Sequence, residues 1–134
     1  MSKFSDKAVE LYKEGYSCSE SIARAASECN IVNVDKELIT SIATSFSGGM
    51  GSGCVCGAVA GSQMVIGLEH GRKSLEASAS GKIKAKEFID EFKSKHKVTC
   101  CKALTGKYEF GSPERKTLCT GLVKDCAEIL EKMI

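Results

Sequence analysis

A glycine-rich stretch followed by an apolar run constrains the fold of this chain more than any other feature. Six of the thirteen glycines fall in the segment Gly48–Gly61, and the segment Ala58–Leu68 is largely apolar. Glycine reaches positive φ without steric cost and lets the backbone approach other groups closely, which predicts a shaped loop before a buried helix. Cys54 and Cys56 lie in this loop, and a thiol at a helix start is near the positive end of the helix dipole, which predicts a lowered thiol pKa. The stretch is therefore a candidate metal or redox site, although glycines also form plain turns and cysteines also simply pack.

The composition favours an all-α protein. The chain has 134 residues, one proline and no tryptophan, and it contains many Ala, Lys, Glu and Ile residues, which favour helix over sheet. We expect a single domain over residues 1–134, a helical bundle of about five to six helices with a central glycine-rich loop and a buried helix. No linker and no internal repeat divides the chain.

Charge and hydropathy argue against several functional classes. The net charge is only +2, which gives no reason to expect nucleic acid as a partner. No segment reaches the roughly 18 to 20 apolar residues of a membrane span, and no apolar core of a secretion signal is visible at the N-terminus. We therefore expect a cytoplasmic protein, where eight cysteines favour metal binding or redox chemistry over static disulfides. His70 and His96 lie in polar surroundings, which predicts surface positions rather than ligands.

Capping residues and apolar periodicity predict the first three helices. Ser5 caps a first helix, and Ser17–Glu20 has the pattern of a capping box for a second helix, with Cys18 at its first position. Asp35 caps a third helix. The predicted apolar stripe of that third helix consists of Leu38, Ile39, Ile42, Ala43 and Phe46.

Three further elements are predicted after the central helix. Residues 83–96 place apolar residues at helical spacing among Lys, Asp and Glu, which predicts a surface helix with a solvated charged face. Thr99 and Gly106 would cap and close one short helical turn, and a long final helix follows Pro113. The bundle is expected to pack these elements around the apolar central helix.

The central helix itself contains three glycines that require an explanation. Each glycine in a helix interior costs about 1 kcal/mol relative to alanine. We therefore expect close packing, or close approach to a bound group, at Gly57, Gly61 and Gly67.

The cysteines match no local metal-binding signature. The chain contains no C-x-x-C, and the segments Cys54–Cys56 and Cys100–Cys101 are the nearest approximations. Cysteines nevertheless occur at three predicted helix starts, and Cys119 and Cys126 share one inward face of the last helix, so several can converge in a bundle. Four converging thiolates suit zinc or an iron–sulfur cluster, and two suit a dithiol/disulfide couple. Burial in the core is the plain alternative for all eight.

Five segments together form a specific pattern: Gly15–Glu20, Phe46–Gly51, Cys56–Gly61, Cys101–Gly106 and Cys119–Val123. This pattern, which spans almost the whole chain, resembles the C_GCAxxG_C_C family of small redox-active proteins. The central motif here reads Cys-Gly-Ala-x-x-Gly, with the cysteine ahead of the first glycine. The resemblance places the four characteristic cysteines of the family at Cys18, Cys56, Cys101 and Cys119. The additional cysteines are Cys29, Cys54, Cys100 and Cys126, and Cys54 or Cys100 could replace its neighbour as a ligand.

The resemblance implies a redox or metal function, with an iron–sulfur cluster held by the four characteristic cysteines and Gly57 and Gly61 next to the cofactor. The family is also similar to the cluster-bearing part of split-Soret cytochromes, but this chain has no C-x-x-C-H site for covalent haem. We expect an electron-transfer or redox accessory protein that works with a partner oxidoreductase rather than a stand-alone enzyme. A metal-free dithiol oxidoreductase and a structural zinc-binding domain are the alternatives.

Overall fold

The computed structural model describes residues 3–134 and confirms the all-α prediction. These residues form seven α-helices and no strand. The number exceeds the expected five to six because the short turn at Cys101 is a helix of its own. The helices are α1 (Lys3–Glu14), α2 (Cys18–Glu28), α3 (Lys36–Thr44), α4 (Gly57–His70), α5 (Ser80–His96), α6 (Cys101–Thr105) and α7 (Pro113–Met133), with a tight turn η1 (Gly49–Gly53) before α4.

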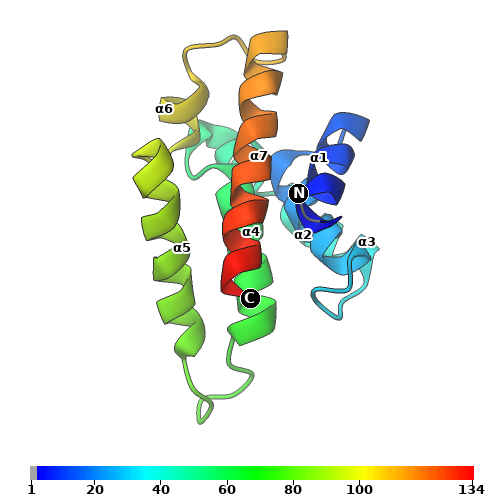
Figure 1. Ribbon diagram of the computed structural model, residues 1–134, viewed down its shortest axis with the longest axis vertical. Helices are drawn as coiled ribbons and strands as arrows, with labels where there is room; N and C mark the ends of the chain where they lie inside the picture. Colours follow the sequence, from blue (N-terminus) through cyan, green and yellow to red (C-terminus); the bar gives the residue numbers. More distant parts are fainter. Residues whose placement is uncertain (1–2) are drawn as a thin grey trace.

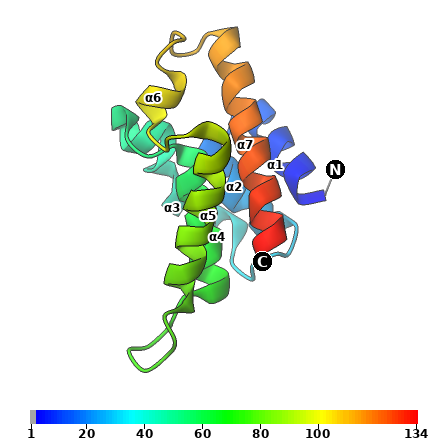
Figure 2. The same cartoon turned by 60° about the vertical axis from the view of Figure 1, so that its left-hand side comes forward.

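Helix α4 is the central element of the bundle. It packs against α2 on one side and against α5 and α7 on the other, and α1 contacts both α2 and α7 (Figure 1). Two views agree that the glycine-rich turn and α6 lie near each other, close to the end of the molecule where α7 begins (Figure 2). The fold thus brings three segments that are far apart in the sequence to one end of the bundle.

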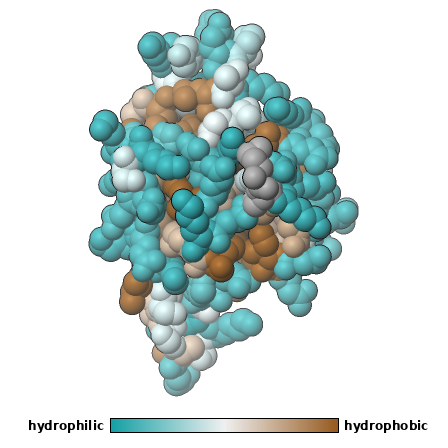
Figure 3. All heavy atoms as spheres, in the orientation of Figure 1, coloured by the Kyte–Doolittle hydropathy of each residue, from teal (hydrophilic) through white to brown (hydrophobic). Residues whose placement is uncertain are grey.

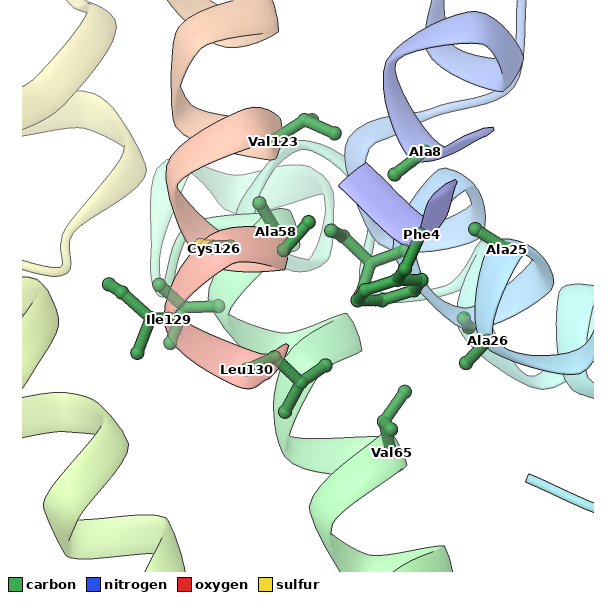
Figure 4. Close-up of a cluster of buried hydrophobic side chains, with 14 of the residues drawn as sticks. Phe4, Ala8, Ala25, Ala26, Ala58, Val65, Val123, Cys126, Ile129 and Leu130 are labelled. Carbon is green, nitrogen blue, oxygen red and sulfur yellow. The ribbon is translucent and has the colours of Figure 1, made fainter. Parts of the chain in front are cut away.

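The core is built from small and branched apolar side chains. Phe4 and Ala8 of α1 meet Ala25 and Ala26 of α2, with α4 and α7 completing the cluster (Figure 4). The predicted buried helix is confirmed, since the buried residues of α4 include Ala58, Val59, Val65 and Ile66. Small residues at these positions let the helix axes approach closely, which concentrates van der Waals contacts.

The predicted caps are confirmed at two helices and wrong at two. Ser17 and Glu20 form a complete capping box, and the Asp35 side chain accepts from the Leu38 amide at 2.9 Å. Ser5 is not a cap but a buried residue inside α1, because the helix already includes Lys3. Cys100, rather than Thr99, occupies the N-cap position of α6.

The outer faces differ in part from the expected apolar stripes. Leu38 and Ile42 of α3 are 53% and 51% exposed, because α3 packs mainly on α2 and leaves its other side in solvent. In α5, Phe88 and Phe92 are buried, whereas Ile83 is exposed. The face shown in Figure 3 is mostly hydrophilic, with a few apolar patches, one of them over α6. None of the helices within residues 3–134 combines the length and apolar composition needed to cross a membrane.

Candidate redox site

Hydrogen bonds between serines fix the start of α2 against the segment that leads into the glycine-rich turn. The Ser47 hydroxyl donates to Ser17 Oγ at 2.6 Å, and the Ser19 hydroxyl donates to the Ala43 carbonyl at 2.8 Å. Ser17 is also the N-cap of α2, so one hydroxyl links the capping box to the turn. These bonds hold Cys18, the first residue of α2, beside the turn.

The glycine-rich turn adopts a conformation that explains its composition. Four successive residues, Gly48 to Gly51, have φ between 61° and 69°, and Gly53 has φ of 71°. This left-handed region costs a residue with a Cβ about 1 kcal/mol or more, so glycine is the natural choice. The prediction of a shaped loop is confirmed, and Met50 is the single non-glycine residue among these positions.

A short antiparallel bridge joins the two paired-cysteine segments. Val55 faces Cys100 across the bridge, the Cys56 amide donates to the Thr99 carbonyl at 2.7 Å, and the Cys101 amide donates to the Cys54 carbonyl. The bridge places Cys56 at the N-cap of α4 and Cys101 at the first position of α6, on adjoining stretches of backbone. Sequence periodicity could not reveal this pairing, because a single bridge has no repeating pattern.

Three of the four predicted site cysteines line one cavity of about 880 Å³. Cys18 comes from the start of α2, Cys101 from α6 and Cys119 from α7, and Gly48, Gly51 and Gly53 complete part of the wall. Cys101 is buried, whereas Cys18 and Cys119 are half-buried. The fold therefore brings together residues that are separated by up to about a hundred positions in the chain.

The fourth cysteine, Cys56, is buried beside the cavity rather than in its wall. The Cys18 sulfur lies against Gly57, where an added Cβ would be only 2.3 Å from that sulfur. Gly57 thus lets Cys18 pack closely on the backbone next to Cys56, which confirms the expected close packing at this glycine. Gly61 is explained by packing on the α2 backbone at Ser19, whereas Gly67 has open space around it, so the expected close packing is wrong there.

Burial is the largest influence on the pKa of Cys18 and of Cys56. It raises the pKa of Cys18 even though backbone amides at Gly48 and Ser19 act in the opposite direction. Burial, followed by the neighbouring Cys18, raises the pKa of Cys56 to about 12 despite opposing hydrogen bonds from the Val59 and Ala58 amides. The helix starts do supply the expected N–H groups, but the prediction that they lower the thiol pKa is wrong because desolvation outweighs them.

Arg115 and Tyr12 are site residues that sequence reasoning missed. Burial raises the pKa of Cys119, while hydrogen bonds from Tyr12 and Arg115 and the charge of Arg115 act to lower it. The Arg115 guanidinium also lies 4.0 Å from Cys101 Sγ. The guanidinium of Arg115 therefore lies close to two cysteine sulfurs. The available sequence signal was a cation four residues before Cys119 in the same helix, since residues four apart share a face.

The remaining cysteines and both histidines lie outside the cavity wall. Cys54 and Cys100 are exposed, and the Cys100 thiol is 3.3 Å from the Gly53 carbonyl. Cys126 is buried in the core, where burial raises its pKa well above the ordinary value, and Cys29 contacts the Lys3 carbonyl. The histidines, His70 and His96, are half-buried rather than fully at the surface, and His96 pairs with Asp125 at 2.9 Å.

The side chains are not arranged around one point. Within residues 3–134, no three His, Cys, Asp or Glu side chains are close enough together to hold a metal ion. The four thiols influence one another electrostatically, since Cys18 and Cys101 raise the pKa of Cys56 and Cys119 raises that of Cys18. The four thiols lie in or next to the wall of one cavity. To bind one shared ligand, their side chains would have to turn towards that ligand.

A family model described as "Putative redox-active protein (C_GCAxxG_C_C)" matches residues 16–133. The chain belongs to the C_GCAxxG_C_C family. This membership confirms the resemblance found in the sequence, and the matched range includes all four predicted site cysteines. No curated protein and no solved structure matches the chain.

The raised pKa values of the cysteine thiols predict that the protein becomes less stable in alkaline solution. The pKa of Cys18, Cys56, Cys119 and Cys126 is raised in the folded, metal-free protein, so the native state keeps protons that the unfolded state has lost. Their contribution is complete below the unfolded pKa of about 9 and is lost as the pH rises towards the folded values. For Cys56, each pH unit between about 9 and about 12 removes about 1.4 kcal/mol from the free energy of unfolding.

Urea unfolding of the reduced, metal-free protein at several pH values from neutral to alkaline measures this dependence. We expect a nearly constant free energy of unfolding up to about pH 9 and a steep fall above it. Replacing Cys126 by alanine should make the fall less steep, because one buried thiol no longer titrates. A free energy that rises above about pH 9 would contradict the burial of neutral thiols.

Proposed function

We propose that Cys18, Cys56, Cys101 and Cys119 hold an iron–sulfur cluster and that the protein transfers electrons to or from a partner oxidoreductase in the cytoplasm. The observation that carries this proposal is that three of these cysteines line one cavity and the fourth lies directly beside it. Family membership supplies the redox character. Four thiolates are the donor set that iron–sulfur clusters use.

The surroundings of the cysteines fit such a cluster in chemistry. The cavity wall contains no carboxylate within residues 3–134, whereas Arg115 is hydrogen-bonded to Cys119 and lies near Cys101. A positive charge beside thiolates offsets the negative charge that they acquire on binding a metal. A bound cluster would supply one-electron transfer at a potential tuned by burial and by hydrogen bonds to its sulfurs.

The chain itself would perform three tasks in this role. The amides at the start of α4, including Gly57, would donate hydrogen bonds to sulfur, while the apolar face of α4 would exclude water. Arg115 and Tyr12 would hold Cys119 in place and favour its thiolate. Because the pKa of Cys18, Cys56 and Cys119 is raised, metal binding would release protons, and affinity would increase with pH.

The test is the content of iron and acid-labile sulfide in protein purified without oxygen, together with the visible spectrum. We expect iron and sulfide in equal amounts and broad charge-transfer absorption. Zinc without sulfide would contradict the proposal and indicate a structural metal. An empty protein after anaerobic reconstitution with iron and sulfide would also contradict it.

A metal-free dithiol/disulfide couple is the second candidate. Its supporting observation is that the Cys18 sulfur lies against Gly57, the residue after Cys56. A couple requires only two thiols whose Cα atoms approach to within about 7 Å. Mass spectrometry after brief exposure to a small-molecule disulfide would detect it as a Cys18–Cys56 crosslink in protein that binds no iron.

A further inference from the structure

The cavity next to the cysteines extends well beyond them. Its volume of about 880 Å³ is in the range of sites that enclose small organic molecules. Four of the described aromatic residues line it, and one of them, Phe110, is 84% exposed. The chain has three tyrosines, and all of them line this one cavity: Tyr12, Tyr16 and Tyr108.

The charged residues of the wall are all cations. Lys102, Arg115 and Lys116 line the cavity, and within residues 3–134 no Asp or Glu does so. None of the ion pairs among these described residues involves any of the three cations. The net charge of the whole chain is only +2, so an uncompensated group of three cations is a local feature rather than a general one.

Two of these cations lie over aromatic rings, and two helix starts add positive charge to the same wall. The Arg115 guanidinium lies 5.1 Å from the Phe110 ring centroid, and the Lys116 ammonium lies 5.8 Å from that of Tyr12. The N-cap residues of α2 and α7, Ser17 and Ser112, also line the cavity, so the positive ends of two helices face it. The wall therefore combines flat apolar surfaces with positive charge, and Arg can bind a carboxylate through two parallel hydrogen bonds.

We propose that this cavity binds a small organic anion with a flat, apolar body, such as an aryl carboxylate. The tyrosines and Phe110 would contact the body of the ligand, and Arg115 and Lys116 would bind its carboxylate. Cys101 and Cys119 lie in the same wall, so the bound molecule would be next to the cysteine site. The proposal concerns binding to the reduced, metal-free protein, because a cluster held by these cysteines would occupy part of the same cavity.

Calorimetric titration of the reduced, metal-free protein with naphthoate, and with the isosteric but neutral naphthamide, tests the proposal. We expect naphthoate to bind about tenfold more tightly or better, because only the anion pairs with the cations. Arg115→Gln should weaken naphthoate binding by about tenfold and leave naphthamide binding almost unchanged. Lys132→Gln removes the same charge from the same helix outside the cavity, so it is the matched control and should change neither affinity.

Nuclear magnetic resonance of protein with isotope-labelled tyrosine rings locates the ligand, because every tyrosine signal comes from this cavity. Naphthoate should shift these signals, and the shifts should be lost in Arg115→Gln. Equal affinities for the two compounds, equal losses in Arg115→Gln and Lys132→Gln, unshifted tyrosine signals, or no binding at millimolar concentration would each overturn the proposal. None of these results measures iron or sulfide content, so the redox proposal is tested independently of the ligand proposal.

Discussion

Gly61→Ala should lower the free energy of unfolding by about 1–3 kcal/mol, whereas Gly67→Ala in the same helix should raise it by up to about 1 kcal/mol. An added Cβ at Gly61 would lie 2.7 Å from the Ser19 carbonyl oxygen and 3.2 Å from its Cα. These atoms belong to the α2 backbone, which cannot rotate away as a side chain can, so α2 and α4 would have to separate. At Gly67, no atom lies within 4 Å of the added Cβ, and alanine gains its ordinary helix propensity.

Urea denaturation of both variants and the parent protein, followed by far-UV circular dichroism, measures the two changes. The pair is matched because both substitutions add one methyl group to α4, so differences in helix propensity cancel. If both variants were stabilised by the same amount, the close packing of α2 on α4 would be contradicted. Loss of stability in Gly67→Ala alone would contradict the exposed position of that residue.

Cys56→Ser should abolish iron binding, whereas Cys54→Ser should leave it essentially complete. Cys56 is buried at the start of α4 beside Cys18, while Cys54 is exposed on the outside of the bridge. Serine cannot supply the soft thiolate that iron–sulfur clusters require, so one lost ligand removes most of the affinity. Iron, sulfide and visible absorption of the anaerobically purified variants give the result directly.

The adjacent pair on α6 provides a second comparison of the same kind. Cys101→Ser should lose the cluster, and Cys100→Ser should retain it, because Cys101 lines the cavity and Cys100 does not. Cys126→Ser is the control for damage to the core, since Cys126 is equally buried but lies outside the cavity wall. Retention of iron in Cys56→Ser or Cys101→Ser would refute the ligand assignment, and loss in all five variants would show that the assay reports folding instead.

Much of the local structure could be predicted because it depends on neighbours in the sequence. The capping box at Ser17 and the cap at Asp35 need only residues three positions apart. The glycine density from Gly48 onwards predicts a loop because left-handed backbone favours glycine in any fold. The wrong assignment of Ser5 as a cap has a tertiary cause instead, since Phe4 is buried against α2 and α1 extends beyond a residue that resembles a start signal.

The site, in contrast, depends on contacts between residues that are far apart in the sequence. The bridge between Val55 and Cys100 and the wall shared by Cys18, Cys101 and Cys119 depend on how α2 and α7 pack on α4 and on how α6 packs on η1 and α7. The pKa of Cys56 shows the same limit, because a position at a helix start predicts a lowered value and burial in the assembled bundle raises it to about 12. Sequence alone determined the helical class, the family and the four cysteines at issue. Only the tertiary structure revealed Arg115, the aromatic cationic cavity and the dominance of burial, because desolvation and charge act between residues that the chain separates and the fold brings together.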